Sequence, residues 1–158
     1  MDQRTRLCKD SQVEMTELVL PNDANRLGNL LGGRLMHMMD IAAAIAASRH
    51  TNRVCVTASV DELHFHHPIK VGEVVILKAS VNRAFNSSVE VGVRIMKEDL
   101  LTGKRTHTNS AYLTFVAIDD DGRPVPVPRI KPQSAEERRR FRDAARRRRQ
   151  RLLHRGRT

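Results

Sequence analysis

Residues 29–49 read NLLGGRLMHMMDIAAAIAASR, a segment that is apolar on nearly every side. Its length, its alanine content and its lack of runs of β-branched residues favour a helix. Because apolar side chains surround the helix axis, we expect the helix to be buried on nearly all sides. Gly32 and Gly33 fall near its start, where backbone N–H groups have no partner within a helix.

Segments with the two-residue alternation of β-strands surround this helix. One segment precedes it at residues 13–20, and four follow at residues 54–60, 74–81, 88–95 and 111–117. The connections predict antiparallel neighbours, with the four later strands in a meander. A curved antiparallel sheet of about five strands wrapped around the long helix would bury both elements. We therefore predict an α+β fold of this kind, with an additional basic helix at the C-terminus.

The positive charge is concentrated at the C-terminus. The formal net charge is +10, and residues 134–158 contain eleven arginines but only three acidic residues. Ser134 followed by Glu137 is typical of a helix N-terminus, so residues 134–153 are predicted to form a solvated, partly helical extension. The alternative is that this segment binds RNA, anionic lipid or an acidic protein, although Phe141 alone provides no stacking platform for single strands.

The chain length of 158 residues suits a single domain. We assign residues 1–11 to a flexible N-terminus, 12–130 to the folded domain and 131–158 to the Arg-rich extension. No apolar run approaches the roughly 18 residues of a membrane-spanning helix. The N-terminal residues lack the apolar stretch of a secretion signal, and Cys8 and Cys55 form no disulfide framework, so we expect a cytoplasmic location.

Asp40 stands in the apolar part of the predicted helix, between Met39 and Ile41. An unpaired buried carboxylate is costly by several kcal/mol, and packing alone rarely retains one. One interpretation is that Asp40 faces a water-filled edge or accepts a hydrogen bond from the backbone. The other is that it lies in a partly apolar cleft, where it acts as a base or a nucleophile.

Three further residues at the helix start allow two interpretations each. Asn29 has the position of a helix cap, but its amide could instead orient a water molecule or a substrate carbonyl. Glycine in a helix interior is less favourable than alanine by about 1 kcal/mol. Gly32 and Gly33 therefore indicate either close packing of the helix on the sheet or exposed N–H groups that stabilise an oxyanion.

The run HFHHP contains His64, His66 and His67. Strand alternation would place His64 and His66 on one face, but no pattern of cysteines or carboxylates completes a set of ligands. We predict that the protein binds no metal ion and needs no cofactor, and that these histidines are solvated.

One helix covers only one face of a sheet. The other face is expected to present Met96, Tyr112, Val116 and Ile118 beside polar residues. A half-apolar outer face and an unpaired edge strand both favour association of two sheets. We therefore predict an obligate homodimer or a larger assembly of dimers.

Three motifs in order make the sequence resemble a known family. They are GN-x-x-GG-x-x-M-x-x-M-D at residues 28–40, PIKVGE at 68–73 and VAIDDDGRP at 116–124. Over about residues 12–130 the chain resembles the hotdog-fold acyl-CoA thioesterases, in particular the cytosolic acyl-CoA hydrolases. The resemblance implies a helix within a curved sheet, assembly as dimers and often as trimers of dimers, and hydrolysis of acyl-CoA to free fatty acid and coenzyme A.

The resemblance also implies roles for individual residues. Asp40 matches the catalytic carboxylate, acting as general base or nucleophile, and Asn29 of the partner subunit would position water or the carbonyl. The N–H groups at Gly32 and Gly33 would polarise the thioester. The loop at residues 83–88 resembles the family's loop near the nucleotide of coenzyme A, and Ser87 and Ser88 match its small hydroxyl residues. For Arg83, Arg94 and Lys97 two interpretations stay open: contacts to the phosphates of coenzyme A, or solvated surface charges.

Two other functions are compatible with the same fold. A hotdog hydratase or dehydratase also acts on acyl thioesters, and His64-Phe65 followed by Pro68 is superficially similar to the site of those enzymes. Its spacing differs, however, and the helix lacks the Glu or Asp–His arrangement of those enzymes. A module that binds acyl-CoA without hydrolysing it is the third possibility, against which Asn29 and Asp40 together count.

Overall fold

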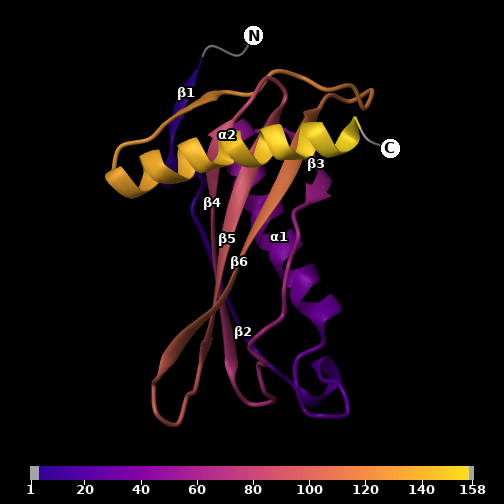
Figure 1. Cartoon of the computed structure of the whole chain (residues 1–158), viewed down its shortest axis with the longest axis vertical. Helices are drawn as coiled ribbons and strands as arrows, with labels where there is room; N and C mark the ends of the chain where they lie inside the picture. Colours follow the sequence, from indigo (N-terminus) through magenta and orange to yellow (C-terminus); the bar gives the residue numbers. More distant parts are fainter. Residues whose placement is uncertain (1–3, 157–158) are drawn as a thin grey trace.

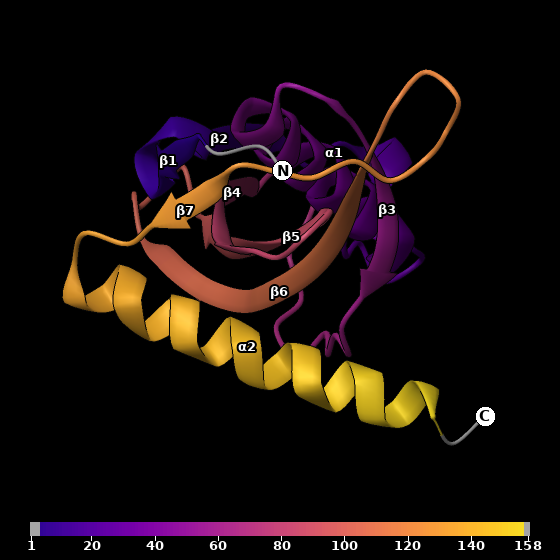
Figure 2. The same ribbon diagram turned by 90° about the horizontal axis from the view of Figure 1, so that it is seen from above.

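The computed structural model describes residues 4–156, and its centre is a helix inside a curved sheet. The helix α1, Gly32–Thr51, lies on the concave side of a five-stranded antiparallel sheet (Figures 1 and 2). The strand order is β2-β4-β5-β6-β3. This confirms the predicted fold. The strands are β2 Val13–Leu18, β3 Val54–Val60, β4 Val74–Ala84, β5 Ser88–Glu98 and β6 Arg105–Ile118.

The core lies between α1 and the concave face of the sheet. It is almost entirely aliphatic, because alternate residues of each strand point toward the helix. On α1 the buried apolar side chains are Leu35, Met38, Met39 and four alanines, and they face Val75, Leu77, Val89, Val91, Val93, Ile95, Leu113 and Phe115. The expected burial on nearly all sides is wrong, since Met36, Ile41 and Ile45 are about two-fifths exposed.

The order of the strands differs from the prediction at β3. Strands β4, β5 and β6 form the predicted meander, but β3 pairs with β6, and β4 pairs with β2. Residues 61–73 between β3 and β4 are long enough to carry the chain from one edge of the sheet to the other. Strand β3 therefore forms one edge of the sheet and β2 the other.

The N-terminal segment is also more ordered than expected. Strand β1, Thr5–Leu7, pairs in parallel with β7, Arg129–Lys131, and a 3-10 helix, Cys8–Ser11, follows it. The Ser11 hydroxyl is buried and accepts a hydrogen bond of 2.9 Å from the backbone N–H of Val81. The expected flexibility of residues 1–11 is thus wrong for residues 4–11, while residues 1–3 lie outside the described residues.

The C-terminal helix α2, Ala135–Arg155, crosses the convex face of the sheet (Figures 1 and 2). Ser134 caps it as predicted, since its hydroxyl accepts a hydrogen bond of 3.1 Å from the N–H of Glu137. Ala144 is buried against the sheet, and Arg147 lies over the ring of Tyr112 at 3.6 Å. The predicted basic C-terminal helix is therefore confirmed, but one side of it packs on the sheet and is not solvated. Nucleic-acid binding by this segment was the alternative, and no observation supports it.

The described residues include no helix with the length and apolar character needed to cross a membrane. This finding agrees with the absence of a long apolar run in the sequence. The expected cytoplasmic location stays a prediction.

Candidate active site

Asp40 lies where α1 faces the edge strand β3. The carboxylate is partly buried, and its Oδ1 accepts a hydrogen bond of 2.7 Å from the hydroxyl of Thr57. Its Oδ2 accepts no hydrogen bond from any described residue. The carboxyl group is therefore oriented through one oxygen and open to a ligand through the other.

Thr57 was not predicted as a site residue. A threonine in an alternating strand is common and gives no signal of its own. Only the packing of α1 beside β3 brings its hydroxyl to the carboxylate of Asp40, 17 residues away in the chain.

An apolar surface surrounds this pair. On β3, the side chains of Val54, Val56 and Val60 are 68%, 44% and 40% exposed. We call the surface formed by β3 and the exposed side of α1 the α1–β3 face. The outer edge of β3 pairs with no strand of the described chain. Exposed apolar patches and unpaired strand edges are typical of protein interfaces. The α1 residues of the face are Met36, Ile41 and Ile45.

The loop before α1 holds two asparagines in one turn. The side-chain oxygen of Asn25 accepts hydrogen bonds from the N–H groups of Leu27, at 2.9 Å, and Asn29, at 3.2 Å. Asn29 does not cap the helix, because the N-cap residue is Leu31. It forms a β-bridge to Lys70 instead. Neither side-chain amide NH₂ group donates to a described residue, so both can bind a ligand.

The two glycines at the start of α1 have different surroundings. A Cβ atom on Gly32 would lie 3.5 Å from the ring of Phe65, which indicates close packing. A Cβ atom on Gly33 would meet no atom within 4 Å, so the backbone there is open to a ligand. Backbone N–H groups exposed at the first turn of a long helix can stabilise a developing negative charge.

The residues predicted to contact the nucleotide do not meet at one place. Arg83 donates a hydrogen bond of 3.0 Å to the carbonyl of Phe141 and stacks on that ring, and Lys97 donates one of 3.1 Å to the carbonyl of Pro68. Ser88 and Lys97 stand at opposite ends of β5, about 30 Å apart. Ser87 precedes β5, and Arg94 is exposed on the convex face. One protomer therefore assembles only part of this set around one phosphate.

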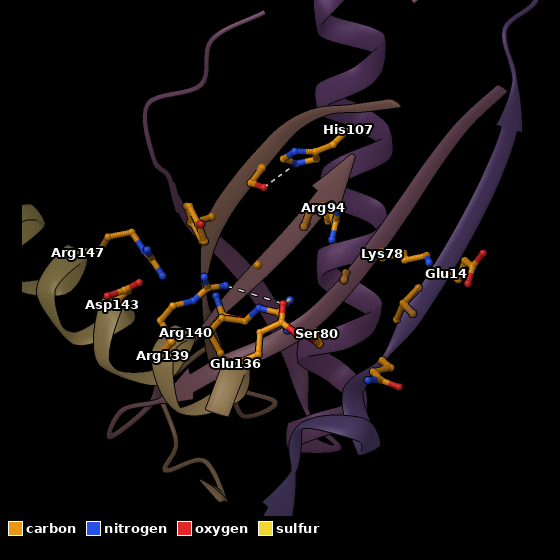
Figure 3. A pocket seen from close by; sticks show the side chains of 18 residues that line it. Glu14, Lys78, Ser80, Arg94, His107, Glu136, Arg139, Arg140, Asp143 and Arg147 are labelled. Carbon is orange, nitrogen blue, oxygen red and sulfur yellow. Dashed lines mark hydrogen bonds and ion pairs between the residues drawn. The ribbon is translucent and has the colours of Figure 1, made fainter. Parts of the chain in front are cut away.

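A groove of about 940 Å³ separates the start of α2 from the convex face of the sheet (Figure 3). It lies on the other side of the sheet from Asp40. The charged residues that line it include Lys78 and Arg94 on the sheet and Arg139, Arg140 and Asp143 on α2.

The histidine run lies in the loop between β3 and β4. The rings of His64 and His66 stack at 5.3 Å, and His64 pairs with Glu62 at 3.0 Å. Among residues 4–156, no three His, Cys, Asp or Glu side chains are arranged to hold a metal ion. The segment is not a strand as expected, but His64 and His66 do lie on the same side, since their rings stack.

Comparison with known proteins identifies the family. A family model described as the thioesterase superfamily matches residues 27–104. Over 133 residues, the chain is 46% identical to an uncharacterised acyl-CoA thioester hydrolase of Bacillus subtilis, covering 84% of this chain and 77% of that protein. The chain belongs to the acyl-CoA thioester hydrolases. This membership confirms the predicted enzyme class, an acyl-CoA thioesterase.

Two solved members of the family share the whole fold. An apo-hexameric acyl-CoA thioesterase superposes with a TM-score of 0.92 and 38% identity, over 96% of this chain and 97% of that chain. The acyl-CoA hydrolase of Staphylococcus aureus, solved with butyryl coenzyme A and coenzyme A, has a TM-score of 0.90 and 36% identity, over 96% and 92%. Both confirm the hotdog fold.

The Staphylococcus enzyme has also been solved as three alanine variants. They replace an asparagine, an aspartate and a threonine, of which the asparagine lies 15 positions before the aspartate and the threonine 17 positions after it.

Proposed function

We propose that the protein hydrolyses acyl-CoA thioesters to free fatty acid and coenzyme A, with Asp40 as the catalytic carboxylate. The observation that carries this proposal is the setting of Asp40. It is partly buried in an otherwise apolar helix, oriented by Thr57, and open at the α1–β3 face. A carboxylate with one oxygen fixed and the other free suits a general base or a nucleophile.

The variants of the Staphylococcus enzyme support this assignment through their spacing. In this chain Asn25 lies 15 residues before Asp40, and Thr57 lies 17 residues after it. Residue types and spacings both agree, which favours Asn25 over Asn29 as the amide of the site. Asn29, which the sequence analysis predicts, is kept as the second candidate because it belongs to the same turn.

In the proposed reaction, a water oxygen attacks the thioester carbonyl carbon while Asp40 accepts the water proton. The carbonyl oxygen becomes an oxyanion, which the exposed backbone N–H group at Gly33 stabilises. The carbon–sulfur bond then breaks, and the coenzyme A thiolate leaves and takes up the proton. In the alternative route, Asp40 attacks the carbonyl itself and water hydrolyses the resulting anhydride.

We further propose that the site is shared between two subunits. Asp40 lies about 12 Å along α1 from Gly32, and the asparagines lie beyond the start of that helix. An amide from a second copy, docked on the α1–β3 face, can reach the Asp40 site more easily than the amide of the same chain. The docking would bury the exposed valines of β3. The apo-hexameric relative supports a trimer of such dimers.

Release of free thiol tests the activity itself. Purified protein is incubated with acyl-CoA from acetyl to palmitoyl, and the thiol of free coenzyme A is detected with a chromogenic reagent. We expect thiol release with at least part of the series. A hydratase leaves the thioester intact and a binding module does not react, so a lack of thiol release with every substrate would contradict hydrolysis.

Mixing two inactive variants tests the shared site. Asn25→Ala and Asp40→Asn are each expected to be nearly inactive, while equal amounts refolded together should recover about a quarter of the wild-type rate. The reason is that half of the dimers are mixed, and each mixed dimer contains one intact site. A second mixture, of Asn29→Ala with Asp40→Asn, serves as the comparison. Failure of both mixtures to recover activity would place each site within one subunit.

A further inference from the structure

Two arginines of α2 fix the helix where it meets the edge of the sheet. Glu90 on β5 is fully buried beneath α2, and its carboxylate accepts hydrogen bonds of 2.8 and 2.9 Å from Arg147. Arg151, one turn later, reaches Glu90 at 3.5 Å and donates hydrogen bonds of 2.9 and 3.2 Å to Asp61. Asp61 follows β3 and still occupies the edge position, since its N–H donates a hydrogen bond of 3.0 Å to the carbonyl of Tyr112 on β6. Because a buried carboxylate needs its cations, α2 is held in place at this edge.

The last turn of α2 continues past the edge. Because β3 is the outermost strand, the residues after Arg151 lie beyond the sheet of their own chain (Figures 1 and 2). Residues 152–155 extend about 6 Å further. Leu152 and Leu153 in this turn are 49% and 69% exposed, so the described chain leaves both without full apolar cover. Adjacent exposed leucines at the end of a helix indicate a contact with another molecule.

A second uncovered apolar surface lies on the convex side of β3. Val54 pairs with Ile118 of β6, and Val56 pairs with Val116. Residues directly opposite each other share a face of the sheet. Since Ile118 and Val116 alternate with the core residue Ala117, the two valines face the convex side. They are 68% and 44% exposed, and α2 leaves them uncovered because it crosses the other end of the strand.

Within one chain these two surfaces cannot meet. Val54 and Asp61 stand at opposite ends of β3, seven residues and about 23 Å apart. The helix α2 is held at the Asp61 end, and its last turn leaves the sheet there. The valines at the start of β3 therefore need cover from a second molecule.

A two-fold axis brings the two surfaces together. When two copies associate along β3, the two strands run antiparallel, because the axis reverses the direction of the strand. The end of one β3 then lies beside the start of the other. The last turn of α2 passes over the edge at the end of β3, so it arrives at the start of the partner's β3, where Val54 and Val56 are exposed.

We propose that α2 is part of the dimer interface: Leu152 and Leu153 of each subunit pack on Val54 and Val56 of the partner subunit. The inference rests on the dimer proposed above and adds to it a contact on the convex side of the sheet. The contact occurs twice in each dimer and covers apolar side chains that a single chain leaves exposed. The buried ion pairs of Glu90 hold each α2 in the position that this contact requires.

Serine variants of the full chain test the energy of the contact. Leu152→Ser combined with Leu153→Ser is expected to raise the dissociation constant of the dimer at least about tenfold, because apolar burial is lost at both symmetric contacts. Sedimentation velocity over a dilution series measures this constant. The kcat measured above that protein concentration should stay at the wild-type value, while the activity per subunit should fall earlier on dilution.

The matched control is Leu100→Ser combined with Leu101→Ser. It makes the same change of atoms in the turn between β5 and β6, where the two leucines are 58% and 96% exposed. We expect the dissociation constant of the dimer to stay within twofold of wild type in this variant.

A disulfide tests the position of the contact. Val54→Cys is combined with Leu152→Cys or with Leu153→Cys, in a chain whose Cys8 and Cys55 are replaced by alanine. A disulfide needs Cα atoms within about 7 Å, so the separation along β3 excludes a bond within one chain. Mild oxidation should give covalent dimers on a denaturing gel without reductant, whereas each single cysteine variant should stay monomeric on that gel.

The outcomes separate this contact from the dimer itself. A dimeric wild-type protein whose dissociation constant is unchanged by the two serines would overturn the α2 contact and leave the shared site standing. A lack of covalent dimers with both cysteine pairs would overturn it as well. A wild-type protein that is monomeric throughout the dilution series would instead overturn the proposed dimer, and the α2 contact with it.

Discussion

Replacing Asp40 by asparagine is expected to lower kcat for acyl-CoA hydrolysis by about a thousandfold, within the range of general acid–base contributions. Asparagine has the same shape, and its side-chain oxygen can still accept the hydrogen bond from Thr57. It can neither take up the proton of water nor attack the thioester. The thiol-release rate measures the loss, and a thermal melt should show the midpoint within a few degrees of wild type, because the substitution conserves the shape of the side chain and its hydrogen bond with Thr57.

The matched control for this variant is Asp121→Asn. It makes the same change of atoms in an exposed turn after β6, and we expect wild-type kcat and KM from it. Retained binding of acyl-CoA by Asp40→Asn would show that the loss lies in the chemical step. Turnover within tenfold of wild type in Asp40→Asn would remove this carboxylate from the mechanism.

The elements of the core could be predicted because each has a local pattern. The helix is largely apolar over its length, and the strands alternate, so most bounds were placed within three residues of those observed, although β6 begins six residues before the predicted start. Asp40 was identifiable for the same reason, since a charge in an apolar helix stands out. The pairing of β3 with β6 was not, because alternation shows which residues share a face but not which strand lies beside which.

The docking of α2 had no local signal at all. Glu90 alternates with valines in β5 as a solvent-facing residue would, and its partner Arg147 lies 57 residues away. A run of arginines is usually solvated, so the composition indicated a solvated extension. Nothing in it distinguished the two arginines that bind a buried carboxylate from the others. The contact between Thr57 and Asp40 likewise depends on packing between two elements and on no motif.

Replacing Glu90 by alanine is expected to lower the free energy of unfolding by about 3–5 kcal/mol, the usual effect of removing one partner of a buried ion pair. Arg147 is only 15% exposed and would keep its charge without an anion, and the amide of Asn82 would lose its acceptor at 3.1 Å. Urea denaturation followed by circular dichroism measures the change. The control is Glu136→Ala, which breaks a surface ion pair with Arg140 and should lower the free energy of unfolding by less than about 1 kcal/mol.

A paired change separates the buried charge from simple loss of packing. Glu90→Leu combined with Arg147→Met replaces the ion pair by apolar side chains, and it should recover most of the stability that Glu90→Ala loses, because no unpaired charge is left under α2. Arg151 keeps Asp61 as its anion in that double variant. If Glu90→Ala were as stable as Glu136→Ala, the charge of Glu90 could not be what holds α2 on the sheet, and the helix would have to be retained by its other contacts, the Arg151–Asp61 ion pair and the packing of Phe141 and Ala144.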